Sequence, residues 1–372
     1  MRNSPRARVV LGLVGLLALA LMVWRTTKPA EAWRPMAGAN VLLITVDTLR
    51  ADRFTATHMP QLAALARQGH VFPTTYAHAP LTLPSHASML TGLLPPVHGV
   101  RGNGAFRLSD AHVTLAERLK SAGYRTGAFI GAFVLDARFG LAQGFDTYRA
   151  VDDDRAFAAD FTFAERPAES VLQDAEAWVP QDTAGSGPWF AWVHVFDPHA
   201  PYVAAGSTPT ASYDGEVRHV DTVLSGFLGR LRARGALERT LLVMTADHGE
   251  GLGEHGESTH GLFAYDATMR VPLVIAGPDL GAATHPEPAA HVDIVPTILD
   301  TLALPGDASL AGRSLRAGDP GTRPIYIEAM DGWLAAGAAP VSGIVRDGLK
   351  WLSLPEPELY DLTLDPTEVT NA

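Results

Sequence analysis

The stretch NVLLITVDT, residues 40–48, is a nearly continuous apolar run that ends in a carboxylate, and TLLVMTADHGE, residues 240–250, repeats the pattern. Such runs are typical of central strands in a parallel sheet covered on both faces. In open α/β sheets, ligands bind beyond the carboxyl ends of the strands. The two stretches therefore predict an α/β fold in which Asp47, Asp247 and His248 converge on one crevice. For Asp47 alone, a turn former or helix cap would be the preferred interpretation.

The stretch APLTLPSHASMLTG, residues 79–92, places the Thr82 hydroxyl just before an expected helix that Pro84 opens and Gly92 closes. The N–H groups at a helix N-terminus carry partial positive charge and stabilise an anion held against them. This arrangement predicts that Thr82 is a nucleophile that meets an anionic ester. The alternative is an ordinary helix cap, because threonine favours such positions without any chemistry.

Five separated segments of the chain follow the order of the motifs of one enzyme family. They are residues 40–48, 82–92, 194–202 (HVFDPHAPY), 247–261 and 358–366. Together they resemble the sulfatase family of the alkaline phosphatase superfamily, from about Asn40 to the C-terminus. The resemblance implies an alkaline-phosphatase-like, doubly wound, mostly parallel sheet flanked by helices, with a small C-terminal antiparallel subdomain. It also implies one or two bound divalent metals and cleavage of sulfate or phosphate esters through a covalently loaded nucleophile.

The departures from the sulfatase pattern lie at positions that contact metal or ester in that family. Thr82 stands where sulfatases carry the Cys or Ser that becomes formylglycine, and the chain contains no Cys, so no formylglycine is expected. Thr48, His86, His248 and His260 stand where many sulfatases have Asp, Arg, Asn and Lys. Direct attack by threonine and a histidine ligand look more like the phosphatases and phosphotransferases of the superfamily, including phosphoethanolamine transferases.

The metal site implied by the resemblance consists of Asp47, Asp247, His248 and the Thr82 hydroxyl. A threonine hydroxyl is a poor nucleophile near neutral pH and needs a base or a metal to stabilise its alkoxide. A divalent cation at these ligands would do so and would withdraw charge from an ester oxygen. Mixed carboxylate and imidazole ligation favours zinc or manganese over calcium or magnesium. We predict one ion rather than two.

Further histidines recur along the matching segments. By resemblance, His199 and His260 contact the transferred group or protonate the leaving oxygen, which suits imidazole because its pKa lies near neutral pH. Asp197 is predicted to bind substrate, although in two-metal relatives the corresponding residues hold a second metal with these two histidines. For His86, a catalytic role and a structural role are equally compatible with the sequence.

Arg101 and Asn103 complete the predicted substrate-binding set. They lie in the stretch HGVRGNG, residues 98–104, and their side-chain N–H groups are predicted to donate hydrogen bonds to anionic ester oxygens. A solvated loop without a site is the alternative interpretation of this stretch.

The composition limits the class of partner. The chain has 372 residues and a formal net charge of -11, with 40 acidic and 29 basic side chains. This charge argues against nucleic acid, whose binders carry basic patches. The predicted partner, an anionic phosphoryl or sulfuryl ester, is what the family resemblance implies. The lack of Cys excludes disulfides but does not identify the compartment.

The sequence of residues 1–32 predicts that the protein is exported from the cytoplasm. Arg2, Arg6 and Arg8 precede an uncharged run from Val9 to Trp24, which is the arrangement of a signal peptide or a signal anchor. The run is somewhat short for a transmembrane helix, and retention in the membrane is slightly favoured. We expect the catalytic part in the periplasm or on the outer face of the membrane, with the N-terminal segment as its membrane contact.

The rest of the pattern alternates strands and helices, as a doubly wound fold requires. The catalytic domain is expected over residues 38–318 and the C-terminal subdomain over residues 319–372. Helices are predicted at residues 59–69, 115–123, 167–178, 213–235 and 293–304, and strands at residues 124–130, 189–196, 271–276 and 325–329. The turn residues around Arg346-Asp347-Gly348 predict an antiparallel hairpin.

These patterns together predict a metal-dependent, sulfatase-like hydrolase in which Thr82 attacks a phosphate, phosphonate or sulfate ester. A phosphoryl-group transferase of the phosphoethanolamine type, acting on a lipid or glycan, is the first alternative. A non-catalytic ester-binding protein is the second, and the joint presence of Thr82, Asp47, Asp247 and His248 argues against it. The alcohol side of the ester is not predicted, because a fold and a metal site do not fix the substrate.

Overall fold

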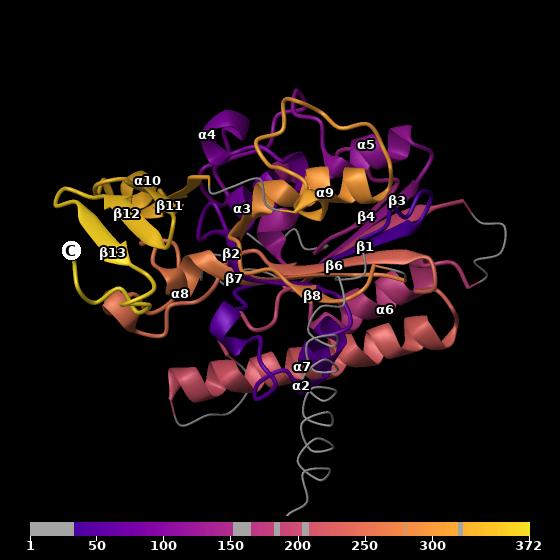
Figure 1. Ribbon diagram of the computed structural model, residues 1–372, viewed down its shortest axis with the longest axis horizontal. Coiled ribbons are helices and arrows are strands. Elements are labelled where there is room, and N and C mark those ends of the chain that lie inside the picture. The colour runs from indigo at the N-terminus through magenta and orange to yellow at the C-terminus, as the bar shows by residue number, and fades with distance from the viewer. Residues whose placement is uncertain (1–32, 152–164, 182–186, 203–207, 279, 319–322) are drawn as a thin grey trace, which may run out of the picture.

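The computed structural model describes residues 33–151, 165–181, 187–202, 208–278, 280–318 and 323–372, which form two sheets (Figure 1). Nine strands form the larger sheet in the order β4-β3-β5-β1-β6-β7-β2-β8, and β9 pairs with β2. Neighbouring strands are parallel, except that β7 runs antiparallel to β6 and β2. The strands are β1 (Asn40–Val46), β2 (His70–Tyr76), β3 (Arg125–Ile130), β4 (Thr147–Arg149), β5 (Trp189–Val195), β6 (Thr240–Ala246), β7 (Arg270–Ala276), β8 (Ala283–Thr284) and β9 (Ala289–Ala290).

The strands β5, β1 and β6 lie side by side in the interior of this sheet, and every residue in them is buried. Their β-branched and large apolar side chains suit strands that are covered on both faces. Val46 at the end of β1 lies opposite Val195 of β5 and Ala246 of β6. Because the three parallel strands end in step, the residues that follow them meet at one edge of the sheet.

Helices cover both faces of the sheet, which confirms the predicted doubly wound architecture (Figure 1). One layer contains α3 (Thr82–Thr91), α5 (Leu115–Ser121) and α9 (Ile294–Thr301), and the other contains α2 (Pro60–Ala66), α6 (Ala168–Trp178) and α7 (Pro209–Ala233). The long helix α7 buries an apolar stripe that recurs every three or four residues, as expected for a helix lying on a sheet. The stripe consists of Tyr213, Val217, Val220, Leu224, Phe227 and Leu231.

Short helices connect the larger elements. The α-helical ones are α4 (Pro95–His98), α8 (Asp266–Met269) and α10 (Asp331–Ala336). The 3₁₀ turns are η1 (Ala51–Arg53), η2 (Phe133–Leu135), η3 (Ala137–Phe139), η4 (Glu254–Gly256), η5 (His291–Asp293) and η6 (Leu315–Ala317).

The C-terminal part forms the predicted small antiparallel sheet, with strands β10 (Ile325–Ala329), β11 (Val341–Arg346), β12 (Leu349–Ser353) and β13 (Glu358–Asp361) in sequential order. The hairpin between β11 and β12 turns at Asp347 and Gly348, both with positive φ, as the turn residues predicted. Buried side chains of this sheet join the core of the larger one. The predicted boundary at residues 318 and 319 falls beside residues 319–322, which lie outside the described residues, and stays a prediction.

Two local differences from the sequence-based expectations have clear physical causes. Helix α3 begins at Thr82, with Leu81 as its N-cap, so the hydroxyl lies in the first turn and not before it. Pro84 is tolerated there because the N–H groups of a helix's first turn have no acceptor within the helix, so the missing N–H of proline costs no helical hydrogen bond. Strand β2 was not predicted, since Pro73 interrupts it, and the register of its pairing with β7 shifts between Phe72 and Thr75.

The predicted signal peptide or signal anchor, residues 1–32, lies outside the described residues. Within the part of the chain that the structure describes, none of the helices combines the length and the apolar character needed to span a bilayer.

We expect Gly92→Ala to lower the free energy of unfolding more than Gly99→Ala. Both glycines end a helix with positive φ, 72° and 78°, so alanine at either position costs about 1 to 2 kcal/mol of backbone strain. A Cβ at residue 92 would lie 2.8 Å from Cδ2 of Leu310, whose half-buried side chain must shift, whereas nothing lies within 4 Å of one at residue 99. Because the tip of a leucine moves easily, chemical denaturation should show a further loss of at most about 1 kcal/mol for Gly92→Ala. Equal losses would contradict the crowding at Gly92.

Candidate active site

The strand register brings two carboxylates together at the carboxyl edge of the sheet. Asp47 follows β1 and Asp247 follows β6, directly after the paired residues Val46 and Ala246. Both aspartates are fully buried. The backbone N–H groups of Thr48 and His248 donate to Asp247 Oδ1 at 3.2 and 2.9 Å, which fixes one side of this carboxylate. The convergence expected from the two apolar runs is thus present in the structure.

The imidazole of His248 faces both carboxylates. Its Nδ1 lies 2.9 Å from the carbonyl oxygen of Gly249, so we assign the proton of the neutral ring to Nδ1. The unprotonated Nε2 then faces the two carboxylates. Nε2 lies 3.6 Å from Asp47 Oδ1 and 3.5 Å from Asp247 Oδ2. Burial lowers the pKa of His248 well below its ordinary value, which favours the neutral imidazole.

The donor atoms of this cluster fit a divalent cation. Both oxygens of Asp47, and Oδ2 of Asp247, have no hydrogen-bond partner among the described residues. Burial, and then repulsion from Asp247, raise the pKa of Asp47 well above its ordinary value. Two unpaired carboxylates are costly in such an interior unless a positive charge compensates them. Asp47, Asp247 and His248 offer ligand atoms within 4.8 Å of one another.

The Thr82 hydroxyl points into the same cluster. Its Oγ1 lies 3.4 Å from His248 Nε2, and the residue is 2% exposed. Helix α3 is held in place by the Ser85 hydroxyl, which donates to the carbonyl oxygen of Asp247 at 2.7 Å. Asn103 Oδ1 accepts from the N–H of Leu83 at 2.9 Å. In the structure Asn103 therefore caps the helix that carries the predicted nucleophile.

His86 is tied to the fold through both ring nitrogens. Nδ1 donates to the carbonyl oxygen of Thr82 at 2.7 Å, and Nε2 accepts from Thr45 Oγ1 at 3.0 Å. Trp192 Nε1 donates to the same Thr45 oxygen at 3.0 Å. Burial lowers the pKa of His86 to about 3. These contacts favour the structural interpretation of His86, in which the ring holds α3 against the sheet.

His260 adjoins His248, and His199 adjoins His260. The ring of His260 lies 4.4 Å from that of His248 and 5.1 Å from that of His199. Glu250, which was not singled out from the sequence, is fully buried, and its Oε1 lies 2.9 Å from His260 Nδ1. Burial lowers the pKa of His260, but the bond with Glu250 outweighs burial, and the pKa is raised. An acid between glycines and next to the Asp-His pair was the signal that could have identified Glu250.

Two predicted substrate-binding residues make other contacts. The Arg101 guanidinium forms a two-pronged ion pair with Glu328 of β10, with N···O distances of 2.5 and 2.7 Å. The carboxylate of Asp197 accepts from the N–H of Ala168 at 3.1 Å, at the start of α6. The structure therefore pairs Arg101 with Glu328 and engages Asp197 with a helix end.

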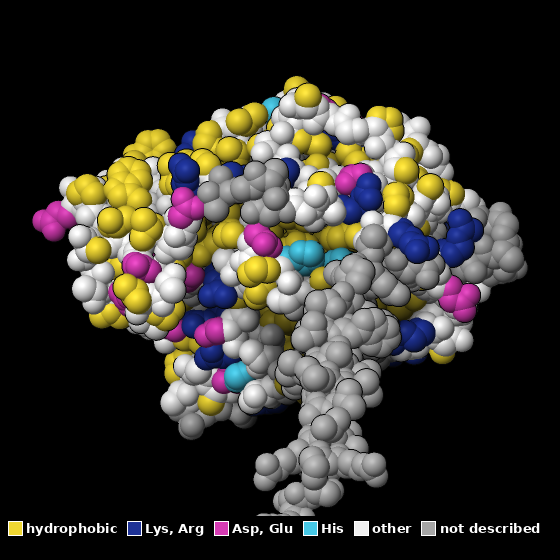
Figure 2. Space-filling view, in the orientation of Figure 1, with side chains coloured by type: hydrophobic (Ala, Val, Ile, Leu, Met, Phe, Trp, Pro, Cys, Tyr) yellow, Lys and Arg dark blue, Asp and Glu magenta, His cyan; other side chains and the backbone are white. Residues whose placement is uncertain are grey.

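A cavity of about 370 Å³ adjoins His199. Phe196, Asp197 and Glu165 are among the residues that line it. Burial and the charge of Asp197 raise the pKa of Glu165. Histidine side chains are visible at the hollow near the centre of the molecular face in Figure 2. The cavity therefore adjoins His199, whose ring lies 5.1 Å from that of His260.

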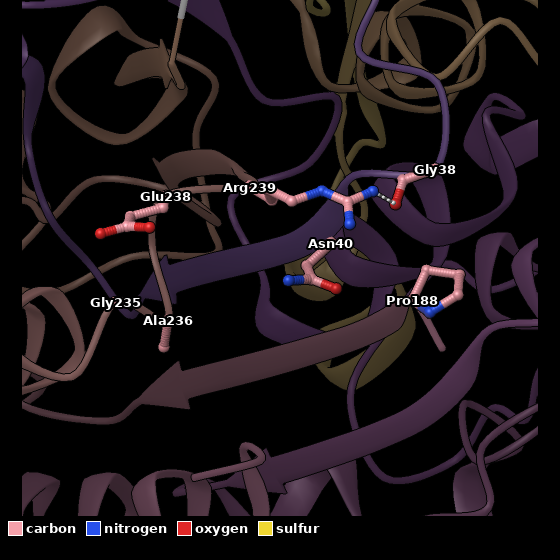
Figure 3. A pocket seen from close by; sticks show the side chains of 7 residues that line it. All are labelled: Gly38, Asn40, Pro188, Gly235, Ala236, Glu238 and Arg239. Atoms are coloured by element: carbon pink, nitrogen blue, oxygen red, sulfur yellow. Dashed lines mark hydrogen bonds between the residues drawn. The ribbon is translucent and has the colours of Figure 1, made fainter. Parts of the chain in front are cut away.

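A second pocket, of about 300 Å³, lies at the opposite edge of the sheet. Figure 3 shows it around Asn40 and Arg239, at the amino ends of β1 and β6. Arg239 hydrogen bonds to the carbonyl oxygen of Gly38 at 3.4 Å. This pocket contains none of the predicted site residues and lies at the wrong ends of the strands for the active site of an open α/β sheet.

Comparisons with known proteins identify the family of this chain. The model of the family described as Sulfatase matches residues 39–304. The choline-sulfatase of Rhizobium meliloti is 25% identical over 89% of this chain and 82% of its own length. The extracellular sulfatase SULF-1 homolog of Drosophila melanogaster is 23% identical over 78% of this chain, which spans only 32% of that longer protein. The phosphonate monoester hydrolase of Agrobacterium radiobacter shares the fold, with a TM-score of 0.72 and 23% identity over 90% of this chain and 91% of that one.

We expect Arg101→Ala to lower the free energy of unfolding by roughly 2 to 4 kcal/mol, because it leaves the buried Glu328 carboxylate without its partner. Replacing both residues, as Arg101→Leu with Glu328→Leu, should recover most of the loss in chemical denaturation. Arg107→Ala is the matched control, since its ion pair with Asp110 is exposed and contributes little. An unchanged stability of Arg101→Ala together with a raised KM would instead support the substrate-binding role.

Proposed function

Because this chain belongs to the sulfatase family, we propose that it is a metal-dependent hydrolase in which Thr82 attacks a phosphate, phosphonate or sulfate ester. The family assignment makes it an ester-hydrolysing enzyme. The observation that carries the proposal is the convergence of Thr82 Oγ1, His248 Nε2 and three unpaired carboxylate oxygens in one buried cluster.

Asp47, Asp247, His248 and Thr82 would hold one divalent cation. When bound, it supplies positive charge that stabilises the Thr82 alkoxide and withdraws electrons from a non-bridging oxygen of the ester. A set of two carboxylates, an imidazole and a hydroxyl favours zinc or manganese over calcium. Since Thr82 cannot mature to formylglycine, the hydroxyl itself is the attacking group.

The chain's own residues supply the remaining steps. The Thr82 hydroxyl releases its proton to solvent, and Oγ1 forms a bond to the phosphorus or sulfur as the bond to the leaving alcohol oxygen breaks. His260, whose pKa the contact with Glu250 raises, gives a proton to that leaving oxygen. A water molecule then gives a proton to His260 and bonds to the phosphorus or sulfur as the bond to Thr82 Oγ1 breaks. We assign contact with the transferred group to His199, whose ring lies 5.1 Å from that of His260.

The start of helix α3 adds to the binding of an anion. The helix is ten residues long and carries Thr82 in its first turn, so its positive end faces the group that Thr82 attacks. Asn103 fixes that turn through the N–H of Leu83. The observed contacts thus support a positioning role for Asn103 and for His86, which binds the carbonyl oxygen of Thr82.

We expect Thr82→Ala to lower kcat on aryl phosphate, phosphonate and sulfate esters by about 10³-fold or more, because the attacking oxygen is lost. Thr82→Ser should retain activity, and the intact mass of the wild-type protein should show no formylglycine. Thr91→Ala, which removes a buried hydroxyl from the same helix, is the control. Full activity in Thr82→Ala would reject the nucleophile, whereas product formed only with an added alcohol acceptor would identify a transferase.

We expect a chelator to abolish turnover and to lower the unfolding temperature by about 5 °C or more, since the cation binds only the folded chain. Zinc or manganese should restore both properties better than calcium. Asp47→Asn should weaken the metal dependence of the unfolding temperature, measured by calorimetry. Turnover and stability that do not respond to the chelator would contradict a metal-dependent site.

A further inference from the structure

His194 is a fully buried polar residue that no step above uses. It lies in β5, opposite Thr45 of β1, and is the one polar side chain in the run Trp189–Val195. Neither of its ring nitrogens has a hydrogen-bond partner among the described residues. A buried imidazole without any partner is costly, so its place in the core calls for an explanation.

The carboxylate of Asp47 lies beside His194. His194 Nε2 lies 3.4 Å from Asp47 Oδ2, and His248 Nε2 lies 3.6 Å from Asp47 Oδ1. The two oxygens of this carboxylate therefore face two different histidines. His248 keeps its Nε2 lone pair toward the cluster, because its proton is on Nδ1. His194 is free to present an N–H from Nε2.

The surroundings hold the His194 ring in this orientation. The ring of His86 packs edge-on against it at 4.9 Å, and Trp192 packs against His86 at 5.2 Å. His86 uses both of its nitrogens for the carbonyl oxygen of Thr82 and the hydroxyl of Thr45. His86 therefore packs against the His194 ring and does not compete with Asp47 for the His194 N–H.

We propose that His194 is a positioning residue for the cation site: its Nε2–H, 3.4 Å from Asp47 Oδ2 and without a hydrogen bond in this structure, donates to that oxygen when the ion binds and thereby directs Asp47 Oδ1 toward the ion. The proposal rests on the proposed cation site. Groups that orient metal ligands in this way commonly contribute about 10- to 100-fold to metal affinity. His194 does not touch the ester, and its effect on turnover passes through Asp47.

The test compares two amide variants that differ in where they place the donor. His194→Gln carries an N–H near the position of Nε2, whereas His194→Asn carries it near Nδ1. The dissociation constants of zinc and manganese are measured for the full chain by competition with a chelating dye, without substrate. We expect His194→Asn to bind metal about 10- to 100-fold more weakly and His194→Gln to stay within roughly threefold of wild type.

The control is His98→Asn, a buried histidine that contacts Ser88 and the Val100 N–H and not Asp47. It should lower the unfolding midpoint of the metal-free protein and leave metal affinity unchanged. Equal affinity of all variants, with only stability lost, would overturn the positioning role. Equal weakening in His194→Gln and His194→Asn would also overturn it and would favour direct ligation by His194. A wild-type protein that binds neither metal would reject the proposed cation site itself, which separates the two failures.

Discussion

The main physical constraint on this structure is the repulsion between two buried carboxylates that lie side by side. Asp47 and Asp247 are fully buried, and three of their four oxygens have no hydrogen-bond partner among the described residues. A fold gains no stability from such a pair by itself, because desolvation and like charge both oppose it. A bound cation would compensate this charge. The residues at the carboxyl edge of the sheet would then be its ligands.

The strand pairing of the sheet fixes the positions of these residues. Parallel pairing of β1 with β5 and β6 fixes which residues follow each other across the edge. Helix α3 then adds the hydroxyl of Thr82 from above the sheet, and its own position is fixed by Ser85, His86 and Asn103. The buried helix start is a rigid support for a nucleophile, because rigid elements place a reacting group more accurately than loops do.

The C-terminal sheet extends this support away from the site. Glu328 of β10 is fully buried and accepts from Arg101, two residues before the capping residue Asn103. The N–H of Glu328 also donates to the carbonyl oxygen of His78, which precedes α3 in the chain. The small sheet therefore contacts both chain segments that flank the start of α3. Loss of these contacts would displace Thr82, the proposed nucleophile, through the backbone.

The sequence by itself determined the fold class and the family and predicted that Asp47, Asp247, His248 and Thr82 lie together, because apolar runs and short motifs are local properties of the chain. The hairpin at Asp347-Gly348 and the helix end at Gly92 were predicted for the same reason, since positive φ is a local requirement. Only the tertiary structure decided the partners of long side chains. Arg101 binds Glu328, 227 residues away, and Glu250 binds His260 across a loop. The place of His194 beside Asp47 depends on strand order and register, which no local pattern encodes.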